Sequence, residues 1–158
     1  MTPTDRNDPA IRTRRASADD AGPVADVYLR SRHASVPAIP PLVHDDPDVR
    51  RHFREVVLVD HETHVAETPD GAVIALLVLD ADWLDHLYVD PAWTGRGVGT
   101  ALVDLAKRRR PGGLQLWAFE ANVDAHRFYE RHGFVVAERT DGSGNEERTP
   151  DRRYVWPG

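Results

Sequence analysis

A glycine-rich turn between a short apolar segment and an amphipathic helix most constrains how this chain can fold. Residues 87–89 are apolar, glycines stand at 95, 97 and 99, and a helical pattern begins at Val98. Glycines let a backbone come close to a ligand, and a helix start offers unpaired N–H groups and a partial positive charge. The pattern predicts a site for a phosphate or pyrophosphate; a tight turn without a ligand is the alternative for this segment taken alone.

Two common nucleotide motifs do not fit the turn. A P-loop requires a lysine after its glycines, and none follows here. The dinucleotide fingerprint requires Gly-x-Gly-x-x-Gly in the first βα unit, whereas the spacing here is Gly-x-Gly-x-Gly and the turn lies past the middle of the chain. The phosphate ligand is therefore of another kind.

A second segment, at 114–136, has the pattern strand, helix, strand. Residues 114–119 read as a strand, Asn122 is a helix cap, Gly133 ends the helix, and the next strand starts at Phe134. One face of the predicted helix carries Ala125, Phe128, Tyr129 and His132.

Together the two segments resemble the GNAT acyl-CoA-dependent N-acetyltransferases. Residues 94–99 resemble the pyrophosphate loop of that family, Gln/Arg-x-x-Gly-x-Gly/Ala, with Gly97 and Gly99 on its small positions and Thr94 in place of Gln or Arg. The second block resembles the family pattern Asn-x-x-Ala-x-x-x-Tyr-x-x-x-Gly-Phe, here Asn122, Ala125, Tyr129, Gly133 and Phe134. The resemblance covers roughly residues 10 to 140.

The element pattern agrees with the fold that this resemblance implies. The sequence predicts the order β-α-α-β-β-β-α-β-α-β-β. We therefore expect an α/β (α+β) GNAT fold, a mixed and mostly antiparallel central sheet with helices on both faces. Residues 1–9 are predicted to be a disordered tail and residues 10–158 a single domain.

The resemblance also implies where acetyl-CoA binds. The strand before the glycine turn and the strand after its helix would splay apart, and the pantetheine arm would pair with the backbone of Leu87 and Val89. The cofactor-binding residues expected on this basis are Leu87, Tyr88, Val89, Thr94, Gly95, Arg96, Gly97, Val98, Gly99, Thr100 and Asn122.

Tyr129 and Asp85 are the expected catalytic residues. The family reaction is direct attack of an amine on a thioester, so the amine must lose a proton and the thiolate must be stabilised. By resemblance, Tyr129 is the acid for the thiolate, because a phenol with a pKa of about 10 can donate a proton; packing beside Phe128, which is assigned to the core, is the alternative.

The base is assigned from the resemblance together with strand alternation, because in many relatives the base, or the water it polarises, is held by residues on the face of Trp83 and Asp85. Alternation places Trp83, Asp85, Leu87 and Val89 on one face, and Leu84, His86 and Tyr88 on the other. Asp85 is the only titratable side chain on the first face, and a half-closed cleft would raise its pKa. A solvent-facing Asp is the alternative, and many GNAT enzymes use no dedicated base. His86 is expected to be a core or interface histidine.

Composition excludes several other classes. The chain has 158 residues, no cysteine and a net charge of −6, which argues against disulfides, thiolate metal sites and bulk attraction to nucleic acid or membrane. The run His61-Glu62-Thr63-His64 lacks the spacing of a zinc motif, so we expect no metal. The sequence shows no signal peptide or membrane span, and a cytoplasmic protein is expected.

The predicted function is transfer of an acetyl group from acetyl-CoA to a primary amine of a small molecule. Acetylation of protein N-termini or lysines, and a non-catalytic acyl-CoA-binding module, remain alternatives. Acceptor recognition is assigned to the loops at 31–47 and 141–149. Its candidate residues are Arg32, His33, His44, Asn145, Glu146 and Glu147. A homodimer is possible, with Trp156, taken to be exposed, as a contact.

Overall fold

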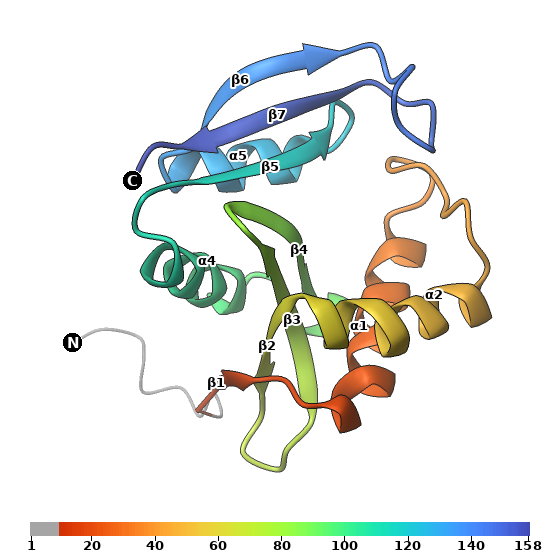
Figure 1. The fold of residues 1–158 in the computed structure, drawn as a ribbon, viewed down its shortest axis with the longest axis vertical. Helices are drawn as coiled ribbons and strands as arrows, with labels where there is room; N and C mark the ends of the chain where they lie inside the picture. Colours follow the sequence, from red (N-terminus) through yellow and green to blue (C-terminus); the bar gives the residue numbers. More distant parts are fainter. Residues whose placement is uncertain (1–9) are drawn as a thin grey trace.

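The computed structural model describes residues 10–158 (Figure 1), so the predicted tail at 1–9 lies outside the described residues. The strands are β1 (Arg12–Arg15), β2 (Glu62–Glu67), β3 (Val73–Asp80), β4 (Trp83–Val89), β5 (Leu114–Phe119), β6 (Val135–Thr140) and β7 (Asp151–Trp156). The helices are η2 (Ala18–Asp20), α1 (Ala21–Ala34), α2 (Asp46–His52), η3 (Phe53–Val57), α3 (Leu58–Asp60), η4 (Pro91–Trp93), α4 (Val98–Arg109) and α5 (Val123–Arg131). The predicted order of the main elements is confirmed.

The strands form one sheet in the order β1-β2-β3-β4-β5-β7-β6. Every neighbouring pair is antiparallel except β4 and β5, which are parallel. The expected mixed, mostly antiparallel sheet is therefore confirmed.

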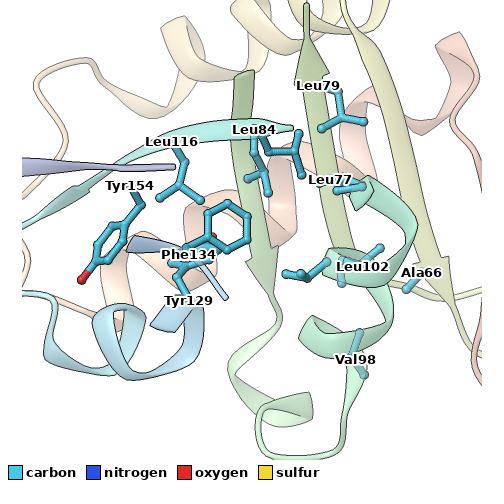
Figure 2. Packing of buried hydrophobic residues seen from close by; sticks show 14 of the residues in the cluster. Ala66, Leu77, Leu79, Leu84, Val98, Leu102, Leu116, Tyr129, Phe134 and Tyr154 are labelled. Carbon is cyan, nitrogen blue, oxygen red and sulfur yellow. The ribbon is translucent and has the colours of Figure 1, made fainter. Parts of the chain in front are cut away.

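Helices cover both faces of the sheet, and each face has its own core. On one face, α4 and α5 pack against strand residues in a cluster that Figure 2 shows around Leu77, Leu79 and Leu102. On the other face, α1, α2 and η3 cover Leu76 and Val78. The alternation of β3 between the two clusters, with residues 74–79 all buried, explains why this strand reads as an almost continuous apolar run.

A β-bulge interrupts β4, and it overturns part of the predicted alternation. Leu84 pairs with Leu79, but His86 pairs with Val78, so Asp85 has no partner residue on β3. Such an extra residue changes which face the following side chains take. Leu84 therefore belongs to the α4 face, as Figure 2 shows, and not to the face of His86 as predicted.

Beyond Trp83, β4 and β5 separate. Their only paired residues are Trp83 and Gln115, among those the structure describes. The Gln115 N–H donates to the Asp82 carbonyl at 2.9 Å, and the rings of Trp83 and Trp117 stack with centroids 6.4 Å apart. Figure 1 shows β5, β7 and β6 turning away from β1–β4. The predicted splay is present, and it leaves one edge of β4 without a strand partner over most of its length.

Trp156 is partly buried and not an exposed C-terminal contact. It packs against the core on the sheet face that α4 and α5 cover, here called the α4-side core. The Lys107 ammonium lies 4.9 Å from its ring centroid. Trp117, with 44% of its surface exposed, is the larger exposed aromatic. None of the helices between residues 10 and 158 is both long and apolar enough to cross a membrane.

Candidate functional site

The glycine turn ends at a helix start that no side chain caps. Gly95 and Gly97 have φ angles of +76° and +82°, a left-handed conformation that other residues adopt only with strain. Gly97 is the N-cap of α4, and the first intrahelical bond runs from the Ala101 N–H to the Gly97 carbonyl at 3.1 Å. The N–H groups of Val98, Gly99 and Thr100 are thus left without a partner within the helix, which suits an anion.

Gly99 is required for a different reason. Its φ is not positive, but a Cβ placed there would lie 3.2 Å from the Phe128 ring. The α5 aromatic therefore packs directly on the backbone of the first turn of α4. We expected Phe128 to be a core residue; it is only partly buried, at the edge of the α4-side core.

The side chains of the turn are engaged locally. The Thr94 hydroxyl donates to the Pro91 carbonyl at 3.2 Å, so it stabilises the turn. The Thr100 hydroxyl lies 3.3 Å from His132 Nε2, at the end of α5. The Arg96 guanidinium lies 4.7 Å from the centroid of the Trp93 ring. Thr94 stands where the family pattern has Gln or Arg, but this difference leaves the backbone N–H groups of the turn available to a ligand.

A cavity of about 690 Å³ opens where β4 and β5 separate. Its volume is in the usual range for small-molecule sites. It lies between the edge of β4, the end of β5, the start of α5 and the loops after α1 and β6. The lining includes Arg32, Ile39, Asp85, His86, Leu87, Tyr88, Phe119, Asn122, Tyr129, Asn145 and Glu147. The structure therefore brings Asp85, Tyr129 and the β4 edge together.

Asn122 has the predicted capping role as well as its place in the lining. Its Oδ1 accepts from the Ala125 N–H at 3.2 Å, and this bond fixes the start of α5. Because the cap sets the axis of α5, it also sets the position of Tyr129 two turns later.

Tyr129 is 8% exposed, and its hydroxyl has no hydrogen-bond partner among residues 10–158. Its oxygen is not one of the fully buried atoms without a partner, so it keeps access to the cavity that it lines. Burial, with a smaller effect of Tyr88, raises the pKa of Tyr129. The hydroxyl is thus a neutral proton donor at physiological pH.

Asp85 stands on the β4 bulge, at the cavity and beside two other titratable groups. Partial burial and the Asp80 carboxylate raise the pKa of Asp85, and His61 lowers it. By surface area Asp85 is exposed, as the alternative of a solvent-facing Asp expected, so water weakens the effects that raise its pKa. The bulge presents this side chain at the point where the strands separate.

Sequence reasoning set His86 aside, and the structure places it in the cavity lining. It contacts Tyr28, Phe53 and Tyr88 through aromatic rings. Burial lowers the pKa of His86 to about 4, so the imidazole is neutral at physiological pH. Strict alternation along an unbroken strand did not predict that His86 lines the cavity. Only the register in which β3 pairs with β4 shows its position.

The two loops assigned to acceptor recognition meet at the cavity. Arg32, Asn145 and Glu147 line it, whereas three other candidates do not. His44 Nε2 lies 3.3 Å from the Glu146 carboxylate and joins the two loops. His33 pairs with Asp46 at 3.1 Å, outside the cavity.

The histidines of the run at 61–64 have different surroundings. His64 hydrogen-bonds Glu62 at 2.7 Å, and Glu62 also accepts from Arg109 and Arg110. His61 lies with Asp80 and Asp85, and ligand atoms of the three are within 4.8 Å of one another. Exposed carboxylates commonly gather in this way without an ion, and the expectation of no metal stays a prediction.

The comparisons with known proteins begin with a family model described as an acetyltransferase (GNAT) domain, which matches residues 55–136. That range includes both sequence blocks, the bulge and the glycine turn.

Curated relatives agree with the family match. The amino-acid acetyltransferase of Mycobacterium tuberculosis is 37% identical over 127 residues, 72% of this chain and 71% of that protein. The peptidyl-lysine N-acetyltransferase YjaB of Salmonella typhimurium is 34% identical over 93 residues, 59% of this chain. An uncharacterized N-acetyltransferase of Methanocaldococcus jannaschii is 28% identical over 108 residues, 59% of this chain. The matches span 63% of YjaB and 48% of the Methanocaldococcus protein.

A solved structure shows the same fold. The PaiA N-acetyltransferase of Thermoplasma acidophilum, in complex with coenzyme A, superposes with a TM-score of 0.73 at 22% identity, over 94% of this chain and 99% of that one.

Proposed function

Because this chain belongs to the GNAT acetyltransferase family, we propose that it transfers the acetyl group of acetyl-CoA to a primary amine of a small acceptor. The observation that carries the proposal is the combination of an uncapped helix start at the glycine turn with an open strand edge beside the cavity. The first suits a pyrophosphate and the second suits an amide-bearing arm, and coenzyme A has both.

The fit of this co-substrate rests on features of the chain itself. The left-handed glycines at 95 and 97 keep side chains away from the unpaired N–H groups of α4. The edge of β4 from residue 84 to 89 faces open space where an ordinary sheet would have a strand. We assign pyrophosphate binding to residues 94–100 and pantetheine pairing to the backbone of Leu87, Tyr88 and Val89.

Acetyl-CoA supplies an activated thioester, and the residues around the cavity hold and move protons. We assign Tyr129 as the acid that protonates or stabilises the departing thiolate, since its hydroxyl is neutral and has no protein partner. The alternative, a packing role, is compatible with its burial but does not use the hydroxyl.

We assign Asp85 as the group that relays the proton of the acceptor amine. A free alkylammonium has a pKa of about 10.4, so the attacking amine must be deprotonated in the site. Asp85 has a raised pKa and stands on the bulge at the cavity. His86 is the competing base, but burial lowers its pKa to about 4, which opposes the protonated form that a base must reach.

A second acceptor class is peptidyl-lysine, because YjaB, which bears that name, is among the relatives. A lysine side chain reaching into the cavity would present the same primary amine. The two classes differ in what surrounds the amine and not in the transfer itself.

The test is release of free thiol from acetyl-CoA across a panel of alkylamines, amino acids, polyamines and lysine peptides. Turnover with an amine acceptor, with the acetylated product identified by mass spectrometry, supports the proposal. Binding of acetyl-CoA without turnover on any amine would instead indicate a binding module.

A further inference from the structure

A buried arginine lines the cavity without a counter-ion. Arg32, in the last turn of α1, is only 6% exposed and lines the cavity. Its Nη1 donates to the Tyr28 hydroxyl at 3.4 Å and its Nη2 to the Pro40 carbonyl at 3.0 Å, while its Nε has no partner. Tyr28, Pro40 and the Tyr88 hydroxyl, which also hydrogen-bonds Arg32, are all neutral partners.

Several other arginines of the described chain have carboxylate partners. Arg30, two residues earlier on the same helix, pairs with Asp90 at 2.6 Å although half of its side chain is exposed. Arg152, which is much less exposed, pairs with Glu120. Arg32 forms no ion pair within residues 10–158.

The absence of a counter-ion matters because a guanidinium cannot lose its charge by releasing a proton. Arginine keeps its proton at all physiological pH values, and a buried charge without a partner is strongly unfavourable. An anion that entered the cavity would therefore be favoured by desolvated, charge-assisted hydrogen bonds. Nε is fully buried, but Nη1 and Nη2 each carry a second N–H beyond the one given to Tyr28 or Pro40, and these can donate to an anion in the cavity.

The acids that share the cavity do not neutralise Arg32. Asp151 is held by the Thr140 hydroxyl and by Asn145 Nδ2 at 3.2 Å, and Asp85 stands beside Asp80 and His61. Glu147 is near enough to Tyr28 and Tyr88 to raise their pKa values, but it is partly exposed to water.

Arg32 also lies on the side of the cavity where the chemistry is assigned. Its guanidinium counteracts the rise in the pKa of Tyr88, a β4 residue that lines the cavity and influences Tyr129 in turn. The Phe119 ring, at the end of β5, is centred 5.9 Å from the Arg32 Cζ. An anion held by Arg32 would thus lie between β4 and β5.

We infer that Arg32 binds a carboxylate of the acceptor, so that the acceptor is an amino acid or a related amine with a free carboxylate. This inference rests on the proposed function, because it names the acceptor class of the same site. It predicts discrimination against amines that lack a carboxylate.

The first experiment compares matched acceptors. Thiol release is measured with the standard L-amino acids, with their amides and methyl esters, and with polyamines and lysine peptides. The amides and esters carry less basic amines, which are more often neutral, so a preference for the acids cannot come from easier deprotonation. We expect kcat/KM for the best acid to exceed that for its amide at least ~10-fold, since a charge-assisted bidentate contact is lost.

The second experiment compares Arg32→Met and Arg32→Lys with the surface control Arg54→Met. We expect Arg32→Met to raise the acceptor KM at least ~10-fold while the KM for acetyl-CoA stays unchanged. Arg32→Lys should recover part of the loss, because it keeps the charge but not the planar fork. Arg54, 61% exposed by its side chain, should affect neither constant.

A binding measurement separates this inference from the proposed function. Amino acids and their amides are added to the protein with CoA present, and the melting temperature is recorded. Acids should stabilise the wild type and Arg54→Met but not Arg32→Met, whether or not transfer occurs. Arg32→Met without a ligand should melt close to the wild type, because the substitution removes an unpaired buried charge.

Three results would overturn the inference. Acids and amides could be used and bound equally well. The Arg32 variants could change the KM for acetyl-CoA and not that of the acceptor, which would assign the anion to CoA. Polyamines or lysine peptides could be the best acceptors with no dependence on Arg32. Absence of turnover on every amine would reject the proposed function instead, and the binding comparison would still decide the role of Arg32.

Discussion

Phe128 packs on Gly99 so closely that a Cβ at position 99 would lie 3.2 Å from the ring. The two residues come from the two sequence blocks that identify the family, one from the start of α4 and one from α5. The contact fixes the helix start that we assign to the pyrophosphate against the helix that carries Tyr129. The two halves of the site are thereby held in one arrangement.

Gly97→Val should weaken binding of acetyl-CoA at least ~10-fold. Valine at a φ of +82° is strained, and relief of that strain moves the N–H groups of the turn. Gly71→Val is the matched control, since Gly71 has a φ of +87° and open surroundings in the turn between β2 and β3. Calorimetry should show normal affinity for this control despite a similar loss of stability. Equal affinity in both variants would remove the basis of the pyrophosphate assignment.

Tyr129→Phe should lower kcat about 10²-fold, the range typical of one positioned acid. Stability and the KM for acetyl-CoA should stay near wild type, because the hydroxyl has no hydrogen bond to the described protein and the ring is retained. Steady-state kinetics and thermal melts provide the measurements. A Phe variant that turns over at the wild-type rate would leave Tyr129 as a packing residue.

Phe128→Ala is the complementary variant and should affect stability first. The ring is only partly buried, so we expect a cost below the ~3–5 kcal/mol typical of a fully buried phenylalanine. Because the contact with Gly99 is lost, the KM for acetyl-CoA should also rise. Chemical denaturation together with kinetics tests both effects, and an unchanged KM would show that this contact does not position the turn.

Asp85→Asn should lower kcat and flatten the acidic limb of the pH–rate profile. The pKa of Asp85 is raised, so in the wild type the rate should fall as the pH drops through that raised value and the carboxylate takes up a proton. Affinity for acetyl-CoA should be retained. If His86→Gln flattens that limb and Asp85→Asn does not, the base is His86.

Glu62→Gln should destabilise the fold at neutral pH. Burial opposes ionisation of Glu62, but hydrogen bonds from Arg109, His64 and Arg110 hold its pKa at about 2. A lowered pKa contributes stability that is present above the unfolded value of 4.5 and is lost as the pH falls toward 2. Denaturant titrations at pH 7 and pH 3 should show that the Gln variant loses less stability on acidification than the wild type, by about 2 kcal/mol at most, because other carboxylates with lowered pKa values, such as Asp20 and Glu67, contribute equally in both proteins. If the Gln variant lost as much stability between pH 7 and pH 3 as the wild type, the hydrogen bonds to Glu62 would not be stabilising the fold.

The parts of the site that depend on local chemistry were predictable, and those that depend on register were not. Gly97 and Asn122 mark the starts of α4 and α5, which depend on local spacing and were located from the sequence, whereas their assignment to acetyl-CoA stays a prediction. The bulge at Asp85 is defined by how β4 pairs with β3, and no periodicity in β4 signals it. Strict alternation therefore placed Leu84 on the wrong face, and it removed His86 from consideration although that residue lines the cavity.

Burial is the second quantity that spacing does not give. Arg32 was predicted as a candidate only because of its loop, and its lack of a counter-ion depends on α1, Pro40 and β5 meeting around it. Trp156 was expected to be exposed, and the cation at Lys107 together with the core holds it in place. In both cases tertiary contacts decide the environment.

From the separation of β4 from β5 we also expect a tendency of the protein to self-associate. An unpaired strand edge is a template on which any extended chain can add, including the same strand of a second molecule. A co-substrate that pairs with β4 would block that template, so the supply of acetyl-CoA would regulate the solubility of the protein as well as its rate of turnover. Light scattering of concentrated protein should accordingly decrease when CoA is added, and Gly97→Val, which we expect to bind CoA poorly, should lose that protection.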